Sequence, residues 1–393
     1  MRQAGSALTV ISSAQTRPLA DERPVFDAHV DSLQRQLDMG HDLGTRTLGH
    51  LDLVRGRQGG LGAAVFVCWA EPKYIAAGLG GARARTVALL NEFHVLLARH
   101  AEGIRFAGNG RMLEEARVAG AMAGIAGIEG GHSIEESLEN LAWFFERGVR
   151  VLTLVWNNHL SWVRSCQPGA GSSIPEGLSD FGRDVVRAMN ELGMVVDLSH
   201  AGERSFYDAL DATSGAAIAS HSGCKALHDH PRNLTDDQLR ELARNGGVAG
   251  IVFCVPFLSA EGRREDARLR ETEAFKSIRA GSDAELSLRQ GEFLQREARP
   301  LPLDRVIDHI VHAVEVAGID HVGIGSDYDG IGRTPEGLED ASCYGRLAER
   351  LMARGFGADD VGKVLGGNMR RVFAQATGPG TRAHKAGLVP MVP

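Results

Sequence analysis

The sequence has few cysteines, no long apolar run and no excess of basic residues. Its five cysteines are scattered and odd in number, and none are spaced as Cys-x-x-Cys, which argues against a disulfide framework and against a zinc ribbon. No apolar stretch is long enough to span a bilayer, and the run 8–11 is too short for the core of a secretory signal. We therefore expect a cytoplasmic protein without a membrane partner.

The charge and the composition further limit the kind of protein that this sequence can be. A net charge of −7 provides no basic field for nucleic acid, so we expect no nucleic-acid partner. Hydrophobic residues make up 43% of the 393 residues, enough for a large core. That length is long for one domain, but an α/β barrel with insertions can use it. We expect an N-terminal arm (1–23), one domain (24–376) and a C-terminal tail (377–393).

Eight short apolar runs alternate with segments of helical periodicity. The runs lie near residues 25, 61, 122, 151, 194, 216, 248 and 321. Uniformly apolar strands joined by helices indicate a parallel sheet that is covered on both faces. Eight such units predict an α/β protein with a (β/α)8 TIM-type barrel, whose site lies at the carboxyl ends of the strands. A doubly wound sheet is the alternative, but no Gly-x-Gly-x-x-Gly follows the first strand.

Several local signals predict where helices begin. Ser133–Glu136 reads as a capping box for a helix through Phe145, and Asp180 reads as the cap of a helix that ends at Gly193. Thr235–Gln238 opens a further helix, which stops at Gly246–Gly247. The charged segment 259–299 predicts a helical insertion, which is either a lid or a solvated helix pair without a role in catalysis.

Histidines and carboxylates stand at the ends of five predicted strands. In chain order they are His29, Asp31, Glu129, His200, His221 and Asp327. One such residue alone is more often a hydrogen-bonded core residue, but in a barrel these positions converge on one mouth. Three histidines and three carboxylates exceed the needs of one zinc, so the set favours two metals roughly 3.5–4 Å apart that share a water. Glu129 can bridge, with His29 and Asp31 at one metal and His200 and His221 at the other. We expect two Zn²⁺, although such ligands also accept Mn²⁺ or Co²⁺.

Six segments carry a resemblance to a known family. They are 27–31 (Asp-Ala-His-Val-Asp), 127–132 (Gly-Ile-Glu-Gly-Gly-His), 196–200 (Val-Asp-Leu-Ser-His), 219–222 (Ala-Ser-His-Ser), 231–233 (Pro-Arg-Asn) and 323–330 (Gly-Ile-Gly-Ser-Asp-Tyr-Asp-Gly). They resemble, in order and spacing, the motifs of the membrane (renal) dipeptidase family, which are binuclear zinc peptidases of the amidohydrolase superfamily. The resemblance extends from about Phe26 to Phe373.

The resemblance implies roles for these residues. The five ligands above match the family's metal ligands, with Glu129 as the bridge. Asp327 resembles the carboxylate that moves the proton between the water and the departing amine, and Arg232 resembles the arginine that clamps the substrate's terminal carboxylate. The family further implies a dipeptide substrate, tolerance of a C-terminal D-residue, and a homodimer.

Two departures from the family pattern leave the substrate open. Trp156 stands where mammalian members carry a histidine that contacts the scissile carbonyl, so Asn157, Asn158, His159 or the metals alone have to replace it, and Trp156 itself can form a wall of the pocket. The run 251–257 has phenylalanine where a substrate-facing tyrosine is expected. An amidohydrolase for another amide, such as an N-acyl amino acid or a biosynthetic tailoring substrate, is therefore the alternative function. A metal-loaded binding protein without turnover is the third possibility.

Overall fold

The structure is a computed structural model that describes residues 25–76, 78 and 81–378. The predicted arm (1–23) and the greater part of the predicted tail, from residue 379 onward, lie outside the described residues. The last helix, α18 (Asn368–Thr377), ends one residue beyond the predicted end of the domain.

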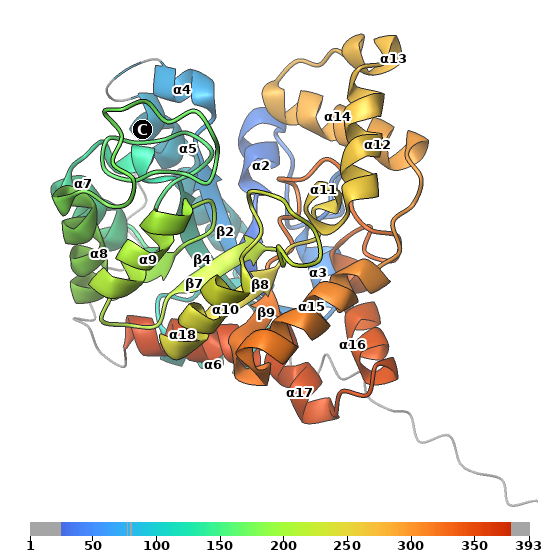
Figure 1. Cartoon of the computed structure of the whole chain (residues 1–393). Helices are drawn as coiled ribbons and strands as arrows, with labels where there is room; N and C mark the ends of the chain where they lie inside the picture. The colour runs from blue at the N-terminus through green and yellow to red at the C-terminus, as the bar shows by residue number, and fades with distance from the viewer. Residues whose placement is uncertain (1–24, 77, 79–80, 379–393) are drawn as a thin grey trace, which may run out of the picture.

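Eight parallel strands form a closed barrel (Figure 1). Their order is β2-β1-β9-β8-β7-β6-β5-β4, and a pairing between β2 and β4 closes the ring. The strands are β1 (Val25–Val30), β2 (Leu61–Trp69), β4 (Met122–Glu129), β5 (Val149–Thr153), β6 (Val195–Asp197), β7 (Ile218–Ser222), β8 (Val248–Ile251) and β9 (Val322–Ile324). This topology confirms the predicted (β/α)8 TIM-type barrel and excludes the doubly wound sheet.

The hydrophobic pattern does not predict one further strand, β3 (Ile104–Phe106), which pairs with the first residues of β4. It has only three residues, and Arg105 at its centre is exposed. So short a segment, with a charge in its middle, shows no apolar run.

Helices surround the barrel and follow most of its strands (Figure 1). They are α2 (Leu33–Met39), α3 (Leu53–Gln58), α4 (Pro72–Ala76), α5 (Gly81–Arg99), α6 (Gly110–Val118), α7 (Leu138–Glu146), α8 (Asp180–Leu192), α9 (Glu203–Ala212), α10 (Asp236–Arg244), α11 (Val255–Leu258), α15 (Asp304–Ala317), α16 (Tyr344–Ala353), α17 (Ala358–Gly362) and α18. Helix α18 lies against one end of the barrel, where Phe373 packs on Phe26 with ring centroids 6.3 Å apart. That end is the amino end of β1, so the opposite, carboxyl end holds the predicted site.

Two of the three predicted helix starts need correction. The capping box at Ser133–Glu136 is wrong: residues 131–134 form a short 3₁₀ turn, and the side chain of Ser137 caps α7 by accepting the backbone N–H of Asn140. Positive φ angles at Glu135 and Glu136 separate the turn from the helix. Helix α8 is capped by Ser179 rather than by Asp180. The predicted helix start at Thr235–Gln238 is confirmed, and the structure shows that Thr235 and Gln238 form a capping box.

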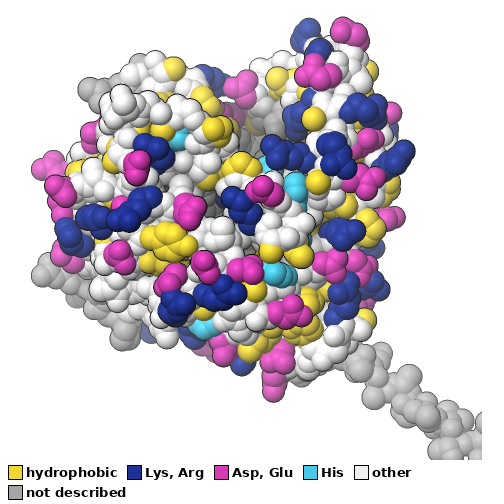
Figure 2. Space-filling view, viewed as in Figure 1, with side chains coloured by type: hydrophobic (Ala, Val, Ile, Leu, Met, Phe, Trp, Pro, Cys, Tyr) yellow, Lys and Arg dark blue, Asp and Glu magenta, His cyan; other side chains and the backbone are white. Residues whose placement is uncertain are grey.

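The predicted insertion is helical. It consists of α12 (Ala260–Arg270), α13 (Glu273–Lys276) and α14 (Asp283–Glu297), which stand beside the barrel in Figure 1. The insertion has a small core of its own around Phe275 and Leu294, and α14 packs against α2. In the space-filling view the surface is hollowed between this insertion and the loops around α4 (Figure 2).

Candidate metal centre

Strands β1 and β7, which each carry a predicted ligand histidine, pair irregularly with a neighbouring strand. Strand β1 has one extra residue relative to β2 within 27–30, and β7 has one relative to β8 within 219–222. Such bulges re-aim side chains and are common next to active sites. His29 and His221 lie in these two segments, and their ring centroids are 3.8 Å apart.

Glu129, the last residue of β4, lies between two groups of ligands. Its Oε2 is 3.6 Å from Nε2 of His29, which in turn is 3.5 Å from Oδ2 of Asp31. Its Oε1 is 2.8 Å from Nε2 of His200 and 3.4 Å from Nε2 of His221. In each group the three ligand atoms lie within 4.8 Å of one another. The structure therefore brings all five predicted ligands together and places Glu129 in both groups.

These donor atoms fit cations better than they fit one another. His29 Nε2 and Asp31 Oδ1 are buried and have no hydrogen-bond partner among the described residues. The Nε2 atoms of His200 and His221 are 3.1 Å apart. Buried polar atoms without partners cost free energy, whereas imidazole nitrogens and carboxylate oxygens are the ligands that zinc takes. The residues present thus fit the expected metals.

The proton affinities of the histidines differ between the two groups. Burial lowers the pKa of His200 to about 4 and that of His221 well below its usual value, so both rings are neutral, the form that binds metal. Burial also acts to lower the pKa of His29, but Glu129 and Asp31 outweigh it and raise that pKa well above the usual value. A cation between these groups would take the place of that proton.

Asp327 lies beside the first group of ligands, which consists of His29, Asp31 and Glu129; the second group consists of Glu129, His200 and His221. A Cβ atom on Gly330 would lie 2.3 Å from a carboxylate oxygen of both Asp31 and Asp327, so the two carboxylates face each other across this glycine. Burial raises the pKa of Asp327 well above its usual range, and the nearby carboxylates act in the same direction. An ionised Asp327, which could accept a proton, therefore requires cations nearby, because opposite charges favour the carboxylate form.

The backbone at two of these positions is unusual. His200 has a φ of 66° and Asp327 a φ of 61°, in the left-handed region that residues other than glycine seldom adopt. Such conformations cluster at functional sites, where the surrounding structure holds them. The backbone N–H of Asp327 donates to the carbonyl of His29, 3.1 Å away, which fixes the segment against β1.

Asn157 contacts His200 of the second group at Nδ1, the ring nitrogen that does not face Glu129. Its Oδ1 lies 2.9 Å from Nδ1 of His200 and also accepts a hydrogen bond from Nε2 of Gln167. Because Oδ1 is an acceptor, Nδ1 of His200 carries the proton and Nε2 is left free for a metal. The sequence suggested Asn157 as a replacement for the family's histidine, whereas the structure places its Oδ1 against His200. Its position just after β5 was the only signal of a role at the site.

Arg232 lies next to His221 of the second group and is 3% exposed. Its Nη2 donates to the carbonyl of His221 at 2.9 Å, while its Nε is buried without a hydrogen-bond partner among the described residues. A cavity of about 450 Å³ is lined by Arg232, His200 and Ser222, among others. A buried cation with a free donor, next to the predicted ligands, suits the binding of a carboxylate.

Trp156 and His159, the two remaining residues predicted at the site, have different surroundings. The indole of Trp156 packs against Trp69, with ring centroids 4.9 Å apart, and lies 6.2 Å from the ring of His200. It therefore forms a wall beside the second group. His159 lies in the following loop, where Nδ1 accepts the N–H of Ser165 and Nε2 is 3.5 Å from the carbonyl of Pro168. These contacts tie the ring of His159 to its own loop.

A family model described as membrane dipeptidase (peptidase family M19) matches residues 13–386. The chain belongs to the membrane dipeptidase family. This confirms the resemblance found in the sequence, and with it the activity class: a metal-dependent dipeptidase, a hydrolase acting on peptide bonds. Among the described residues, no helix is long and apolar enough to cross a membrane.

Three known proteins are similar to this chain over most of its length. An uncharacterised dipeptidase of Schizosaccharomyces pombe is 30% identical over 379 residues, which are 92% of this chain and 83% of that protein. A metallopeptidase from Rhodobacter sphaeroides, solved with a phosphinate mimic of the dipeptide L-Ala-D-Ala, is 25% identical with a TM-score of 0.74, covering 90% of this chain and 99% of that one. The probable dipeptidase PvdM of Pseudomonas aeruginosa shares the fold, with a TM-score of 0.79 at 22% identity over 91% of this chain and 96% of its own.

Proposed function

We propose that this member of the membrane dipeptidase family holds two zinc ions and hydrolyses dipeptides, including those with a C-terminal D-residue. The observation that carries the proposal is the position of Glu129, whose two oxygens face different groups of ligands. The similarity to a structure that binds a mimic of L-Ala-D-Ala supports the choice of substrate. His29 and Asp31 would hold one ion, His200 and His221 the other, and Glu129 both.

Bound zinc ions would lower the pKa of a water and polarise the scissile carbonyl. The remaining work falls to residues of the chain. The free Nε donor of Arg232 is available to the substrate's terminal carboxylate, which would fix the position of the peptide bond relative to the ligands. Asp327, as the carboxylate that nearby cations would favour, would accept a proton from the water and pass it to the departing amine.

The proposal is tested by amine release from L-Ala-D-Ala, L-Ala-L-Ala and an N-acyl alanine, with zinc-reconstituted protein beside Glu129→Ala. We expect turnover of both dipeptides that is lost in the variant, together with two zinc ions per chain by metal analysis. The ratio of the two dipeptide rates measures the stereochemical preference. Two bound zinc ions without dipeptide turnover would contradict the proposed substrate.

The second candidate is an amidohydrolase for an N-acyl amino acid or a tailoring substrate. The packing of Trp156 on Trp69 favours it, because an aromatic wall next to His200 suits an apolar acyl group. Faster release from the N-acyl alanine than from either dipeptide would select this candidate. The homodimer and the cytoplasmic location stay predictions.

A further inference from the structure

Beneath the two ligand groups lies a carboxylate that the proposed function does not use. Oδ2 of Asp197 accepts hydrogen bonds from the hydroxyls of Thr153 and Ser220, each at 2.6 Å. Oδ1 accepts the backbone N–H groups of Ser199 at 3.0 Å and of Ser220 at 2.8 Å. All four residues are buried. Asp197 lies within reach of His29 and His221, but four donors already occupy its oxygens, so it is not a ligand in this arrangement.

The hydroxyl of Ser220 touches one histidine of each group. Its Oγ is 2.8 Å from Nδ1 of His221 and 3.4 Å from Nδ1 of His29. The contact to His221 has the length of a normal hydrogen bond, and the contact to His29 is longer and weaker. Among the described residues, no other acceptor for Nδ1 of His29 is found.

The carboxylate decides the direction of these hydrogen bonds. A hydroxyl has one proton and two lone pairs. Three other donors point at the oxygens of Asp197, so at 2.6 Å from Oδ2 the proton of Ser220 must point to Asp197 as well, because two lone pairs at that distance would repel each other. Both lone pairs of Ser220 are then left to accept protons from its remaining neighbours, which are the two Nδ1 atoms and the Oγ of Ser199 at 3.3 Å. Because Ser220 then has no proton left to donate, Nδ1 of each histidine is a protonated nitrogen, and Nε2, the atom nearer to Glu129, is the nitrogen available to a metal.

We infer that Ser220, held by Asp197, is a positioning residue shared by both metal sites, and that it fixes the tautomer and ring orientation of His29 and His221 together. This inference rests on the proposed two-metal function. It assigns to one hydroxyl an effect on both sites, whereas Asn157 contacts His200 of the second site alone.

The test is a titration of metal-free protein with zinc, using a competing chelator to obtain two stepwise dissociation constants. Losing an outer partner of a metal-ligating histidine typically weakens metal binding by about 10- to 100-fold. We expect Ser220→Ala to raise both dissociation constants, the His221 site nearer the upper end of that range. Ser222→Ala is the matched control, since Ser222 lies on the same strand, is equally buried and has a hydroxyl without a partner among the described residues. We expect both of its constants to match those of the unmodified protein, and Asn157→Ala to change only one.

The outcomes separate this inference from the proposed function. If the unmodified protein binds fewer than two zinc ions, the proposed function fails. If it binds two and Ser220→Ala leaves either constant unchanged, the shared role of Ser220 is wrong although the function stands.

A measurement on the unmodified protein covers the case in which Ser220→Ala does not fold. In zinc-loaded protein labelled with ¹⁵N-histidine, we expect the rings of His29 and His221 to carry their proton on Nδ1, protected from exchange with solvent. A proton on Nε2 of either ring would overturn the inference.

Discussion

At the residue scale, the proposed mechanism depends most on Asp327. Its carboxyl group lies beside the ligands, and burial with its neighbours raises its pKa. A positioned acid–base group contributes about 10²- to 10⁴-fold to the rate. We expect Asp327→Asn to lower kcat for a dipeptide by a factor in this range, with little change in KM and with the zinc content unchanged. Steady-state kinetics and metal analysis on the same sample check this, and a variant that keeps its kcat would remove Asp327 from the mechanism.

A variant of Arg232 tests substrate binding separately from the catalytic step. Its planar group offers several donors at fixed angles, which a lysine cannot reproduce. Hydrogen bonds to charged groups contribute about 1.5–3 kcal/mol, so we expect Arg232→Lys to raise KM for a dipeptide roughly 10- to 100-fold. The same dipeptide with an amidated C-terminus is the control substrate, because it has no carboxylate. The unmodified enzyme should strongly prefer the free acid, and the variant should lose most of this preference. Equal preference in both proteins would show that Arg232 does not bind the carboxylate.

The sequence predicts the ligands better than it predicts what surrounds them. Each ligand closes an apolar run, and a parallel barrel brings the ends of such runs together whatever the details of packing. The contact of Asn157 with His200 depends instead on the loop after β5 and on the left-handed backbone of His200. Neither the course of this loop nor that backbone conformation can be predicted from hydrophobic periodicity. The bulges in β1 and β7 are invisible for the same reason.

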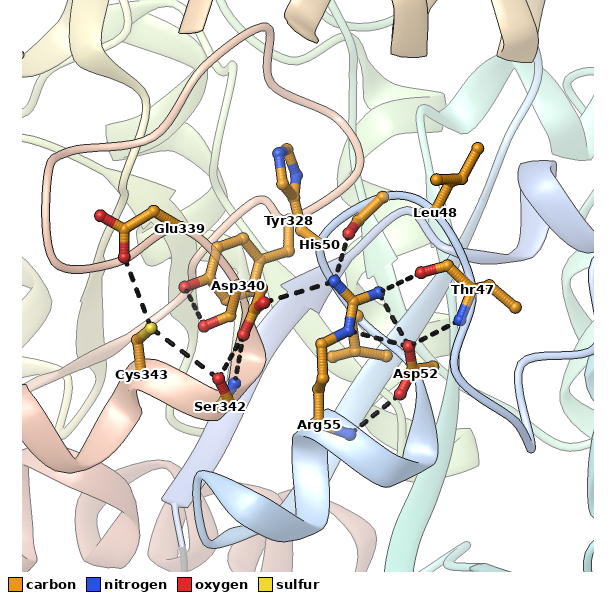
Figure 3. A network of polar contacts seen from close by, with 12 residues as sticks. Thr47, Leu48, His50, Asp52, Arg55, Tyr328, Glu339, Asp340, Ser342 and Cys343 are labelled. Carbon is orange, nitrogen blue, oxygen red and sulfur yellow. Dashed lines mark hydrogen bonds and ion pairs between the residues drawn. The ribbon is translucent and has the colours of Figure 1, made fainter. Parts of the chain in front are cut away.

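At the element scale, a buried arginine joins the loop before α3 to the segment that follows β9 (Figure 3). Arg55 Nε donates to Asp52 at 2.8 Å, its Nη2 donates to the carbonyl of Thr47 at 3.0 Å, and Nη1 lies 3.4 Å from Asp340. The hydroxyl of Tyr328, the residue after Asp327, donates to the carbonyl of Asp340 at 3.0 Å. The network therefore supports the backbone that carries Asp327.

Removing that arginine leaves Asp52 buried and unpaired. Breaking a buried ion pair by deleting one partner costs about 3–5 kcal/mol. We expect Arg55→Met to lower the free energy of unfolding by this amount in urea titrations. Arg117→Met is the matched control, because Arg117 and Glu114 form an ion pair of the same sequence spacing, with side chains that are 45% and 58% exposed. Exposed pairs contribute about 0–1 kcal/mol, so equal losses in the two variants would contradict the role of the network.

The predicted elements are correct where side chains face the core and wrong where the chain turns. The capping box at Ser133 fails because the chain reverses through Glu135 and Glu136, both at positive φ, before Ser137 can cap α7. A capping box is a pattern of four neighbouring residues only. The tight turn of the chain after β4 prevents a helix from starting at Ser133, although the pattern is present. The helix start predicted at Thr235 is confirmed because nothing interrupts the helix that follows.

At the scale of the whole molecule, the five ligands come from the ends of four strands. His29 belongs to β1, Glu129 to β4 and His221 to β7, while Asp31 directly follows β1 and His200 follows β6. They form one cluster only when the barrel is closed, and the unfolded chain does not hold them together. Metal binding should therefore stabilise the folded barrel as a unit.

This coupling predicts how stability responds to removal of the metal. A ligand that binds only the folded state adds about 2.7 kcal/mol to the free energy of unfolding at a concentration 100 times its Kd. We expect zinc-loaded protein to unfold at higher urea than chelator-treated protein, with a difference that grows with the logarithm of free zinc. Glu129→Ala should lose most of this difference, since Glu129 faces both ligand groups. Ser222→Ala should keep it. If zinc stabilises Glu129→Ala as much as the unmodified protein, the metal is held somewhere other than at these strand ends.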